Sequence, residues 1–113
     1  MIIGAMEGGK VCIFDDVAHV MSEWGPFPGD VESEVIIFYD FDGVWLKPLV
    51  SQSPRRLGGL LPGAKTFELV RDPNLDQDVD PIWLALFEAS TLMPNSHVSS
   101  LSELRARFPK DAT

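Results

Sequence analysis

The stretch from Glu34 to Val50 constrains the fold of this chain more than any other, because two apolar runs flank a single Asp42-Gly43 pair. An Asp-Gly pair between runs rich in Val, Ile, Phe, Tyr and Trp predicts a β-hairpin whose two turn residues both have positive φ. The first run is apolar on both faces, which predicts a central strand covered on both sides. Because Pro48 has no N–H to donate, the second run is expected to form an edge strand or to end there.

The region before this hairpin predicts a second hairpin and a helix. Gly8 and Gly9 separate two short apolar runs and suit a tight turn between antiparallel strands. Residues 17–24 place apolar side chains at helical spacing after an acidic pair that can cap a helix. Gly25 is expected to end this helix in the left-handed conformation. The turn-rich residues 26–33 are expected to form a loop.

The region after the hairpin predicts one strand and two helices. Residues 64–71 alternate in a way that suits a strand. Residues 81–93 begin with proline and are apolar around nearly the whole circumference, which predicts a buried helix. Ser100 and Glu103 form a capping box for a final short helix. The chain therefore predicts an α+β fold, with a small antiparallel sheet built from hairpins and with a buried helix and two short helices packed on it, in a single domain spanning 1–113.

Charge and composition exclude several classes of partner. Nine Lys and Arg residues against 17 Asp and Glu residues give a formal net charge of −8. Nucleic acids and anionic membranes attract basic surfaces, so neither is expected as a partner, and a basic protein surface is the natural complement. Cys12 is the only cysteine, which excludes an internal disulfide and suits a reducing compartment. No apolar run approaches the length of a membrane span and no targeting segment is evident, so a cytoplasmic protein is expected.

Acidic side chains gather at the tip of the central hairpin and in the stretch that follows the predicted strand 64–71. If both lie at one end of the sheet, they form a negative patch that steers a basic partner by long-range attraction. A solvated acidic face is the simpler alternative. The predicted partner-binding residues are Asp40, Asp42, Asp72, Asp76, Asp78 and Asp80.

The same acidic stretch partly matches a calcium-binding loop. Oxygen-bearing side chains occupy alternate positions from Asp72 to Asp80, as in the loop of an EF-hand. However, Gln77 stands where that loop needs glycine, and Trp83 stands where it needs a bidentate glutamate. A solvated loop at a helix N-terminus explains the carboxylates more simply, so neither a metal nor a cofactor is expected.

Catalytic motifs are lacking in the sequence. Cys12, His19 and His97 are the only candidates for thiol–imidazole chemistry. Cys12 lies between apolar residues of a predicted strand and is expected to be a small buried side chain. His19 lies off the apolar stripe of its helix, and His97 lies in a polar connection. No catalytic residue is therefore predicted.

Two functional hypotheses follow. The first is a small acidic, non-catalytic protein-binding module, such as an immunity protein or an inhibitor that blocks a basic surface of its partner. The alternative is a small enzyme or an anion-binding domain that uses the long loop 51–63. In that loop, Arg55 and Arg56 precede two glycines and are the predicted ligand-binding residues. The sequence leaves the oligomeric state open.

Overall fold

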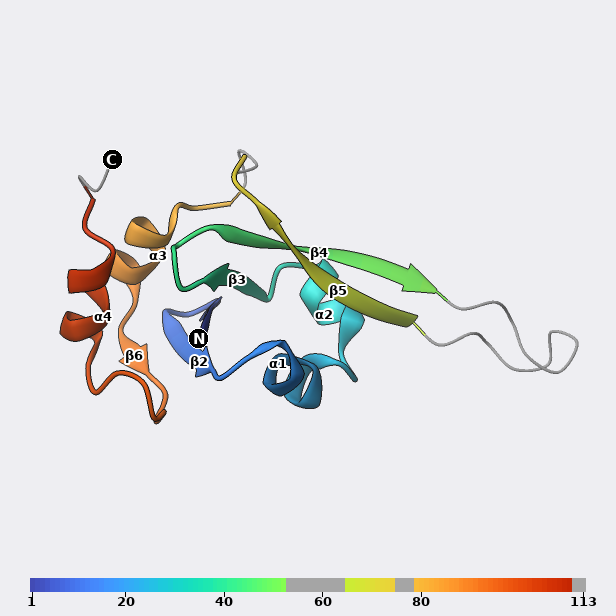
Figure 1. Ribbon diagram of the computed structural model, residues 1–113, viewed down its shortest axis with the longest axis horizontal. Helices are drawn as coiled ribbons and strands as arrows, with labels where there is room; N and C mark the ends of the chain where they lie inside the picture. Colours follow the sequence, from blue (N-terminus) through green and yellow to red (C-terminus); the bar gives the residue numbers. More distant parts are fainter. Residues whose placement is uncertain (53–64, 75–78, 111–113) are drawn as a thin grey trace, which may run out of the picture.

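The computed structural model describes residues 1–52, 65–74 and 79–110 and contains one mixed sheet (Figure 1). The strand order is β5-β4-β3-β1-β2-β6, and every pairing is antiparallel except that of β2 with β6. The strands are β1 (Ile2–Met6), β2 (Lys10–Phe14), β3 (Ile36–Asp40), β4 (Trp45–Gln52), β5 (Lys65–Asp72) and β6 (Thr91–Leu92). The helices are α1 (Val17–Trp24), α2 (Pro28–Glu32), α3 (Ile82–Glu88) and α4 (Leu101–Arg107). The predicted α+β class is confirmed.

Helices cover both faces of the sheet. Ile36 and Phe38 of β3 pack in the same cluster as residues of α1 and α2, whereas Tyr39 packs with residues of α3 and α4. The first cluster consists of the buried residues Ile2, Phe14, Val20, Val31, Ile36, Phe38, Leu46 and Phe67. The second consists of Ile3, Val11, Ile13, Tyr39, Ile82, Leu86, Ala89, Val98 and Leu104. The alternation along β3 thus confirms the prediction of a strand buried on both sides.

Both hairpins have three-residue loops, which differ in their positive-φ residues. Between β1 and β2, Met6 pairs with Lys10 and the N–H of Gly9 donates to the carbonyl of Met6. Gly8 and Gly9 both have a φ of +84°, so the predicted hairpin is present, but its loop is one residue longer than the predicted two-residue turn. In the turn between β3 and β4, only Gly43 has positive φ. Its N–H donates to the carbonyl of Asp40, and the N–H of Asp40 donates to the carbonyl of Val44, so the loop has three residues. The prediction of a two-residue primed turn at Asp42-Gly43 was therefore wrong.

The side chain of Asp40 explains the wider loop. Its Oδ1 accepts hydrogen bonds from the backbone N–H groups of Asp42 and Val44, each at 2.9 Å. Aspartate commonly stabilises turns by bonding to the backbone two residues further on. These two local bonds favour a three-residue loop, which the Asp-Gly pair alone does not specify.

Strand β4 is an inner strand, and the prediction of an edge was wrong. It pairs with β5 along its whole length, so β5 is the edge. Pairing of β4 with β3 ends at Leu46. The carbonyl of Val44 points toward β3. Because the backbone polar groups of alternate residues point to the same side of a strand, the nitrogen of Pro48 also points toward β3. The missing N–H of Pro48 thus lies where β3 no longer pairs, which makes the proline compatible with an inner strand.

The chain between β2 and β3 forms two helices. Asp16 caps α1 as expected, and its Oδ1 accepts a hydrogen bond of 2.8 Å from the N–H of His19. Gly25 is right-handed, with a φ of −53°, and donates to the carbonyl of Met21, so the predicted left-handed end was wrong. Pro28 then occupies the first turn of α2, where its missing N–H costs nothing. The expected loop 26–33 thus contains a helix.

Helix α3 ends at Glu88, well before the predicted end of the helix 81–93. Beyond it the chain is extended, and the N–H groups of Ser90 and Thr91 both donate to the carbonyl of Gly9. These bonds to a distant hairpin favour β6 over further helix, since tertiary contacts override local propensity. The predicted burial around the whole circumference was also wrong, because Phe87 is 74% exposed.

Helix α4 follows its predicted cap with one difference. The Oγ of Ser100 accepts a hydrogen bond from the N–H of Glu103. The carboxylate of Glu103 accepts bonds from the N–H and the Oγ of Ser99, rather than from the backbone of Ser100. These bonds to Ser99 lower the pKa of Glu103.

Candidate functional site

The predicted patch at the hairpin tip is partly neutralised within the molecule. Asp72 lies opposite Trp45 in the sheet, so the end of β5 lies beside the start of β4 and near the tip. Arg71 approaches both tip carboxylates, with its Nε 2.5 Å from Oδ2 of Asp40 and its Nη2 3.3 Å from Oδ2 of Asp42. The Oδ1 of Asp72 accepts a hydrogen bond from the N–H of Asn74. These carboxylates therefore already have internal partners.

The other predicted residues fall into two groups. Asp76 and Asp78 of the acidic stretch, together with Arg55 and Arg56 of the long loop, lie outside the described residues. Asp80 is described and lies at a different place from the hairpin tip. It lines a pocket of approximately 390 Å³ beside α3.

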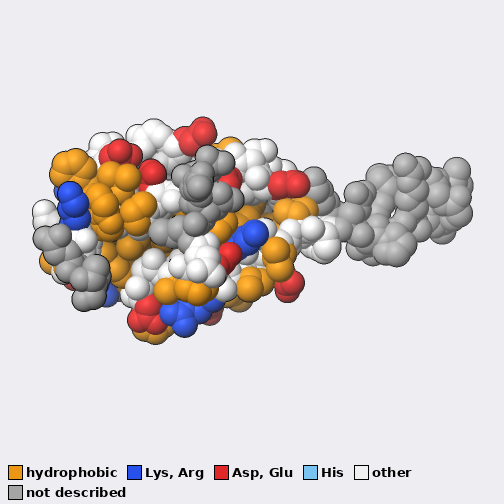
Figure 2. All heavy atoms as spheres, turned by 90° about the horizontal axis from the view of Figure 1, so that it is seen from above, with side chains coloured by type: hydrophobic (Ala, Val, Ile, Leu, Met, Phe, Trp, Pro, Cys, Tyr) orange, Lys and Arg blue, Asp and Glu red, His pale blue; other side chains and the backbone are white. Residues whose placement is uncertain are grey.

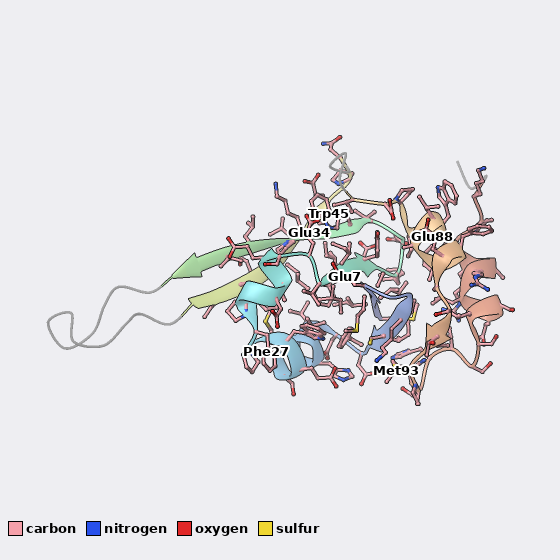
Figure 3. The ribbon with its side chains drawn as sticks, turned by 180° about the vertical axis from the view of Figure 1, so that it is seen from behind. Glu7, Phe27, Glu34, Trp45, Glu88 and Met93 are labelled. Atoms are coloured by element: carbon pink, nitrogen blue, oxygen red, sulfur yellow. The ribbon has the colours of Figure 1, made fainter. Side chains whose placement is uncertain are left out.

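This acidic pocket is lined by four exposed carboxylates, those of Glu7, Glu34, Asp80 and Glu88. Three of them come from separate elements, after β1, before β3 and at the end of α3 (Figure 3). Among the described residues, no Lys or Arg lines the pocket. Within the described part of the chain, no basic side chain forms an ion pair with any of the four. Within residues 1–52, 65–74 and 79–110, the pocket therefore presents four carboxylates that have no basic side chain as a partner.

The contact between the β1–β2 hairpin and the end of α3 positions two of these carboxylates, those of Glu7 and Glu88. The N–H of Glu7 donates to the carbonyl of Val35, at a distance of 3.1 Å, which fixes the end of β1 against the start of β3. The carbonyl of Gly9 accepts the hydrogen bonds from Ser90 and Thr91 that follow α3. A Cβ at Gly9 would lie 3.3 Å from the carbonyl oxygen of Glu88, so the two backbones approach closely there.

Glu34 holds an unusual backbone conformation at the rim of the pocket. Its φ of 60° is the only positive value for a non-glycine residue in the described ranges 1–52, 65–74 and 79–110. A left-handed conformation costs a side chain such as glutamate about 1 kcal/mol or more. The bonds from Glu34 N–H to Val31 and from Val35 N–H to Asp30 keep the chain in this tight turn between α2 and β3.

Tyr39 lies at the base of the acidic pocket, and its hydroxyl group is already used. The ring is buried, and the hydroxyl donates to the backbone carbonyl of Asp80. Burial, aided by the negative charge of Asp80, raises the pKa of Tyr39, so the hydroxyl stays protonated at neutral pH. Tyr39 therefore positions Asp80 and does not act as a base. The arrangement suits the binding of an ammonium or guanidinium group.

The candidates for thiol–imidazole chemistry are separated. The Sγ of Cys12 lies 3.7 Å from Sδ of Met6, and burial raises the pKa of this thiol, which disfavours the reactive thiolate. His19 and His97 instead meet Asp15. The Nδ1 of His19 accepts a bond from the N–H of Asp15, and Nε2 of His97 lies 2.6 Å from its Oδ1. The bond to His97 lowers the pKa of Asp15.

Two further findings concern metals and membranes. No cluster of three or more His, Cys, Asp or Glu side chains in residues 1–52, 65–74 and 79–110 is arranged to hold a metal ion. In the same ranges, no helix has the length and the apolar character needed to cross a membrane.

The fold and the pocket define this chain as an α+β protein with an acidic surface pocket. No protein-family model, no curated protein and no solved structure matches the chain. A function for this protein therefore has to be inferred from its own residues. Sequence reasoning identified Asp80 but missed Glu7, Glu34 and Glu88. The one local sequence feature that pointed to any of these three residues was the Gly8-Gly9 turn, which directly follows Glu7 and fixes its position.

Proposed function

We propose that this protein is a non-catalytic protein-binding module that covers a basic surface of its partner, as an immunity protein or another inhibitor would. The observation that carries the proposal is the acidic pocket, which is lined by four carboxylates and, among the described residues, by no basic side chain. Exposed like charges in one place repel each other, and a cation from outside relieves this repulsion. An Arg or Lys side chain of a partner would meet carboxylates from several sides.

The backbone of Glu34 supports the same interpretation. A strained residue at the rim of a pocket lowers the stability of the protein, and such residues are common where a site has to be preorganised. Here the left-handed conformation occurs at one of the four pocket carboxylates. Binding would benefit from a carboxylate that is already in place, because less ordering is needed when the partner arrives.

The net charge of −8 supports the choice of a basic partner. Long-range attraction between surfaces of opposite sign accelerates association, and it weakens as salt shortens the Debye length from roughly 10 Å at 0.1 M. Binding through the acidic pocket should therefore be strongly salt-dependent, mainly through the association rate.

The test compares two variants of equal net charge as baits in a pull-down from source-cell lysate at low and high salt. The pocket variant carries Glu7→Gln, Glu34→Gln and Glu88→Gln. The control variant carries Glu23→Gln, Asp30→Asn and Glu68→Gln, which are exposed acids outside the pocket. A basic protein retained by the wild type at low salt should be lost with the pocket variant and kept with the control variant. Purified partner and bait then give the rates by surface plasmon resonance.

Two results would contradict the proposal. Equal retention by the pocket and control variants would show that net charge, rather than the acidic pocket, determines binding. Retention that is unchanged at high salt would show that the contact does not depend on exposed charge.

A further inference from the structure

A groove between α3 and α4 has the opposite chemistry from the acidic pocket. Its volume is approximately 550 Å³, and its apolar lining includes Trp83, Leu84, Phe87 and Phe108. The side chain of Phe87 is 74% exposed. A partner that filled the groove would bury this aromatic ring. Figure 2 shows hydrophobic side chains gathered at the left end of the molecule, where α3 and α4 lie, next to Lys and Arg side chains. An exposed apolar surface with a charged rim is typical of a protein-binding site.

Among the residues that the structure describes, the charged ones that line the groove are Arg105 and Lys110, with no Asp or Glu. The guanidinium of Arg105 donates to the carbonyls of Leu86 and Ala89, at 2.8 Å and 2.7 Å, which fixes it at the end of α3. The Nζ of Lys110 lies 5.2 Å from the centre of the Trp83 ring. Among the residues that the structure describes, no carboxylate forms an ion pair with Lys110.

A neighbouring depression lengthens this surface. It shares Trp83, Phe108 and Lys110 with the groove and continues to Phe41, which is 64% exposed. It also adds Arg107, whose Nη2 lies 3.9 Å from Oε1 of Glu103. Among the described residues, the one acid in its lining is Asp42, which Arg71 contacts.

We propose that this groove binds an amphipathic helix of a partner protein, whose apolar face is flanked by Asp or Glu. An apolar groove accepts the hydrophobic side chains at positions i, i+3, i+4 and i+7 of such a helix. The positive rim selects acidic flanks, because unlike charges across an interface favour the correct partner and repel others. This site is separate from the acidic pocket and does not depend on the proposed function.

The sign of the rim also argues against a second copy of this chain as the occupant. A symmetric dimer places the same patch of both copies face to face. A contact centred on the groove would therefore bring Arg105 and Lys110 of one copy toward the same cations of the other. Like charges in such a contact are destabilising.

The test uses two designed, fluorescently labelled peptides of about 16 residues, long enough for partial helix formation. Both carry Leu at i, i+3, i+4 and i+7, and they differ only in having Glu or Lys at the flanking positions. Fluorescence anisotropy should show that the wild-type protein binds the Glu peptide at least about tenfold more tightly than the Lys peptide. Phe87→Ser should weaken binding of the Glu peptide by about tenfold or more, and Lys110→Glu should reduce the preference for the Glu peptide over the Lys peptide.

The matched control is Phe27→Ser, which changes another exposed aromatic residue, 52% exposed and outside the groove. It should leave binding of both peptides unchanged. The proposal is overturned if both peptides bind equally, or if Phe27→Ser weakens binding as much as Phe87→Ser. It is also overturned if analytical ultracentrifugation shows a dimer that Phe87→Ser dissociates, since the groove would then bind a second copy.

Discussion

The acidic pocket and the α3–α4 groove lie on different sides of the same short helix and have opposite chemistry. Ala85 and Glu88 of α3 line the pocket, whereas Trp83, Leu84 and Phe87 line the groove. Of the described residues, the charged side chains that line the pocket are acidic, and those that line the groove are basic. A helix whose apolar residues surround most of its circumference thus serves as a wall for two unlike surfaces.

Under the two proposals, one helix separates two modes of recognition. Attraction of a basic partner to the pocket would be mainly electrostatic, would act at long range and would weaken with salt. Binding of an amphipathic helix in the groove would depend mainly on removing apolar area from water, at roughly 25 cal/mol per Å², and salt would weaken only the contribution of its charged flanks. Substitutions on one side of α3 should therefore affect one mode and leave the other.

The largest expected effect comes from Leu104→Ala, which tests whether the two surfaces are separable. Leu104 lies on α4 with an exposed fraction of 0%, so truncation leaves a cavity and should lower the free energy of unfolding by about 3 kcal/mol. Urea denaturation gives this value. Helix α4 lines the groove and not the acidic pocket, so the Glu peptide should lose affinity while a basic partner keeps its affinity. Equal losses at both surfaces would show that they are coupled through α3.

The next effect comes from two glycines with the same backbone conformation. Gly8 and Gly9 both have a φ of +84°, so alanine at either position costs about 1 kcal/mol in backbone strain. A Cβ at Gly8 has no neighbour within 4 Å, whereas one at Gly9 would lie 2.9 Å from Oγ and 3.2 Å from N of Ser90. Gly9→Ala should therefore destabilise the protein by about 1 kcal/mol more than Gly8→Ala.

The same pair shows how the hairpin shapes the pocket. Gly9→Ala pushes the hairpin away from the end of α3 and should weaken the binding of a basic partner, while the groove keeps its affinity for the Glu peptide. Gly8→Ala is the matched control for strain and should leave both affinities unchanged. Equal destabilisation by the two variants, measured by urea denaturation, would contradict the close approach at Gly9.

Several features that depend on neighbouring residues were predictable from the sequence, although the turn at Asp42-Gly43 and the end of α1 at Gly25, which are also local, were not. The hairpin at Gly8-Gly9, the cap at Asp16 and the cap at Ser100 each require only residues a few positions apart. The early end of α3 depends instead on hydrogen bonds to the carbonyl of Gly9, far away in the sequence. No helical or strand period contains that information.

The candidate site shows the same limit. Three pocket carboxylates come from different elements, and their meeting depends on the strand order and on the end of α3. The hairpin-tip acids were easy to find because they are close in sequence, yet Arg71 pairs with both of them. Charge clusters in a sequence therefore indicate where carboxylates are, but the fold decides which of them stay uncompensated.

A smaller effect should separate stability from binding at Glu34. Asparagine tolerates the left-handed conformation better than glutamate, so Glu34→Asn should stabilise the protein by about 0.5 kcal/mol. The same change removes a pocket carboxylate and should slow association with a basic partner. Glu7→Gln is the control, because it removes a carboxylate without relieving strain. If Glu34→Asn destabilises the protein, the left-handed turn is not strained.

The smallest effect tests a pH response that lies outside both surfaces. The hydrogen bond from His97 lowers the pKa of Asp15 below its usual value of 3.8, so the folded state favours the ionised carboxylate. This contribution to stability is present above the unfolded pKa and is lost as the pH falls through the lower folded pKa. Asp15→Asn should therefore reduce thermal stability at pH 6, and the difference from wild type should shrink as the pH falls below 3.8.

Glu68→Gln provides the reference for this pH response, because the exposed carboxylate of Glu68 lies away from His97 on the edge strand β5. Its difference from wild type should change less with pH than that of Asp15→Asn. Neither substitution touches the acidic pocket or the groove, so binding to a basic partner and to the Glu peptide at pH 6 should be the same as for wild type. A binding defect in Asp15→Asn would mean that the contact between Asp15 and His97 positions one of the two surfaces, and the pocket and groove would then not be independent of the rest of the sheet.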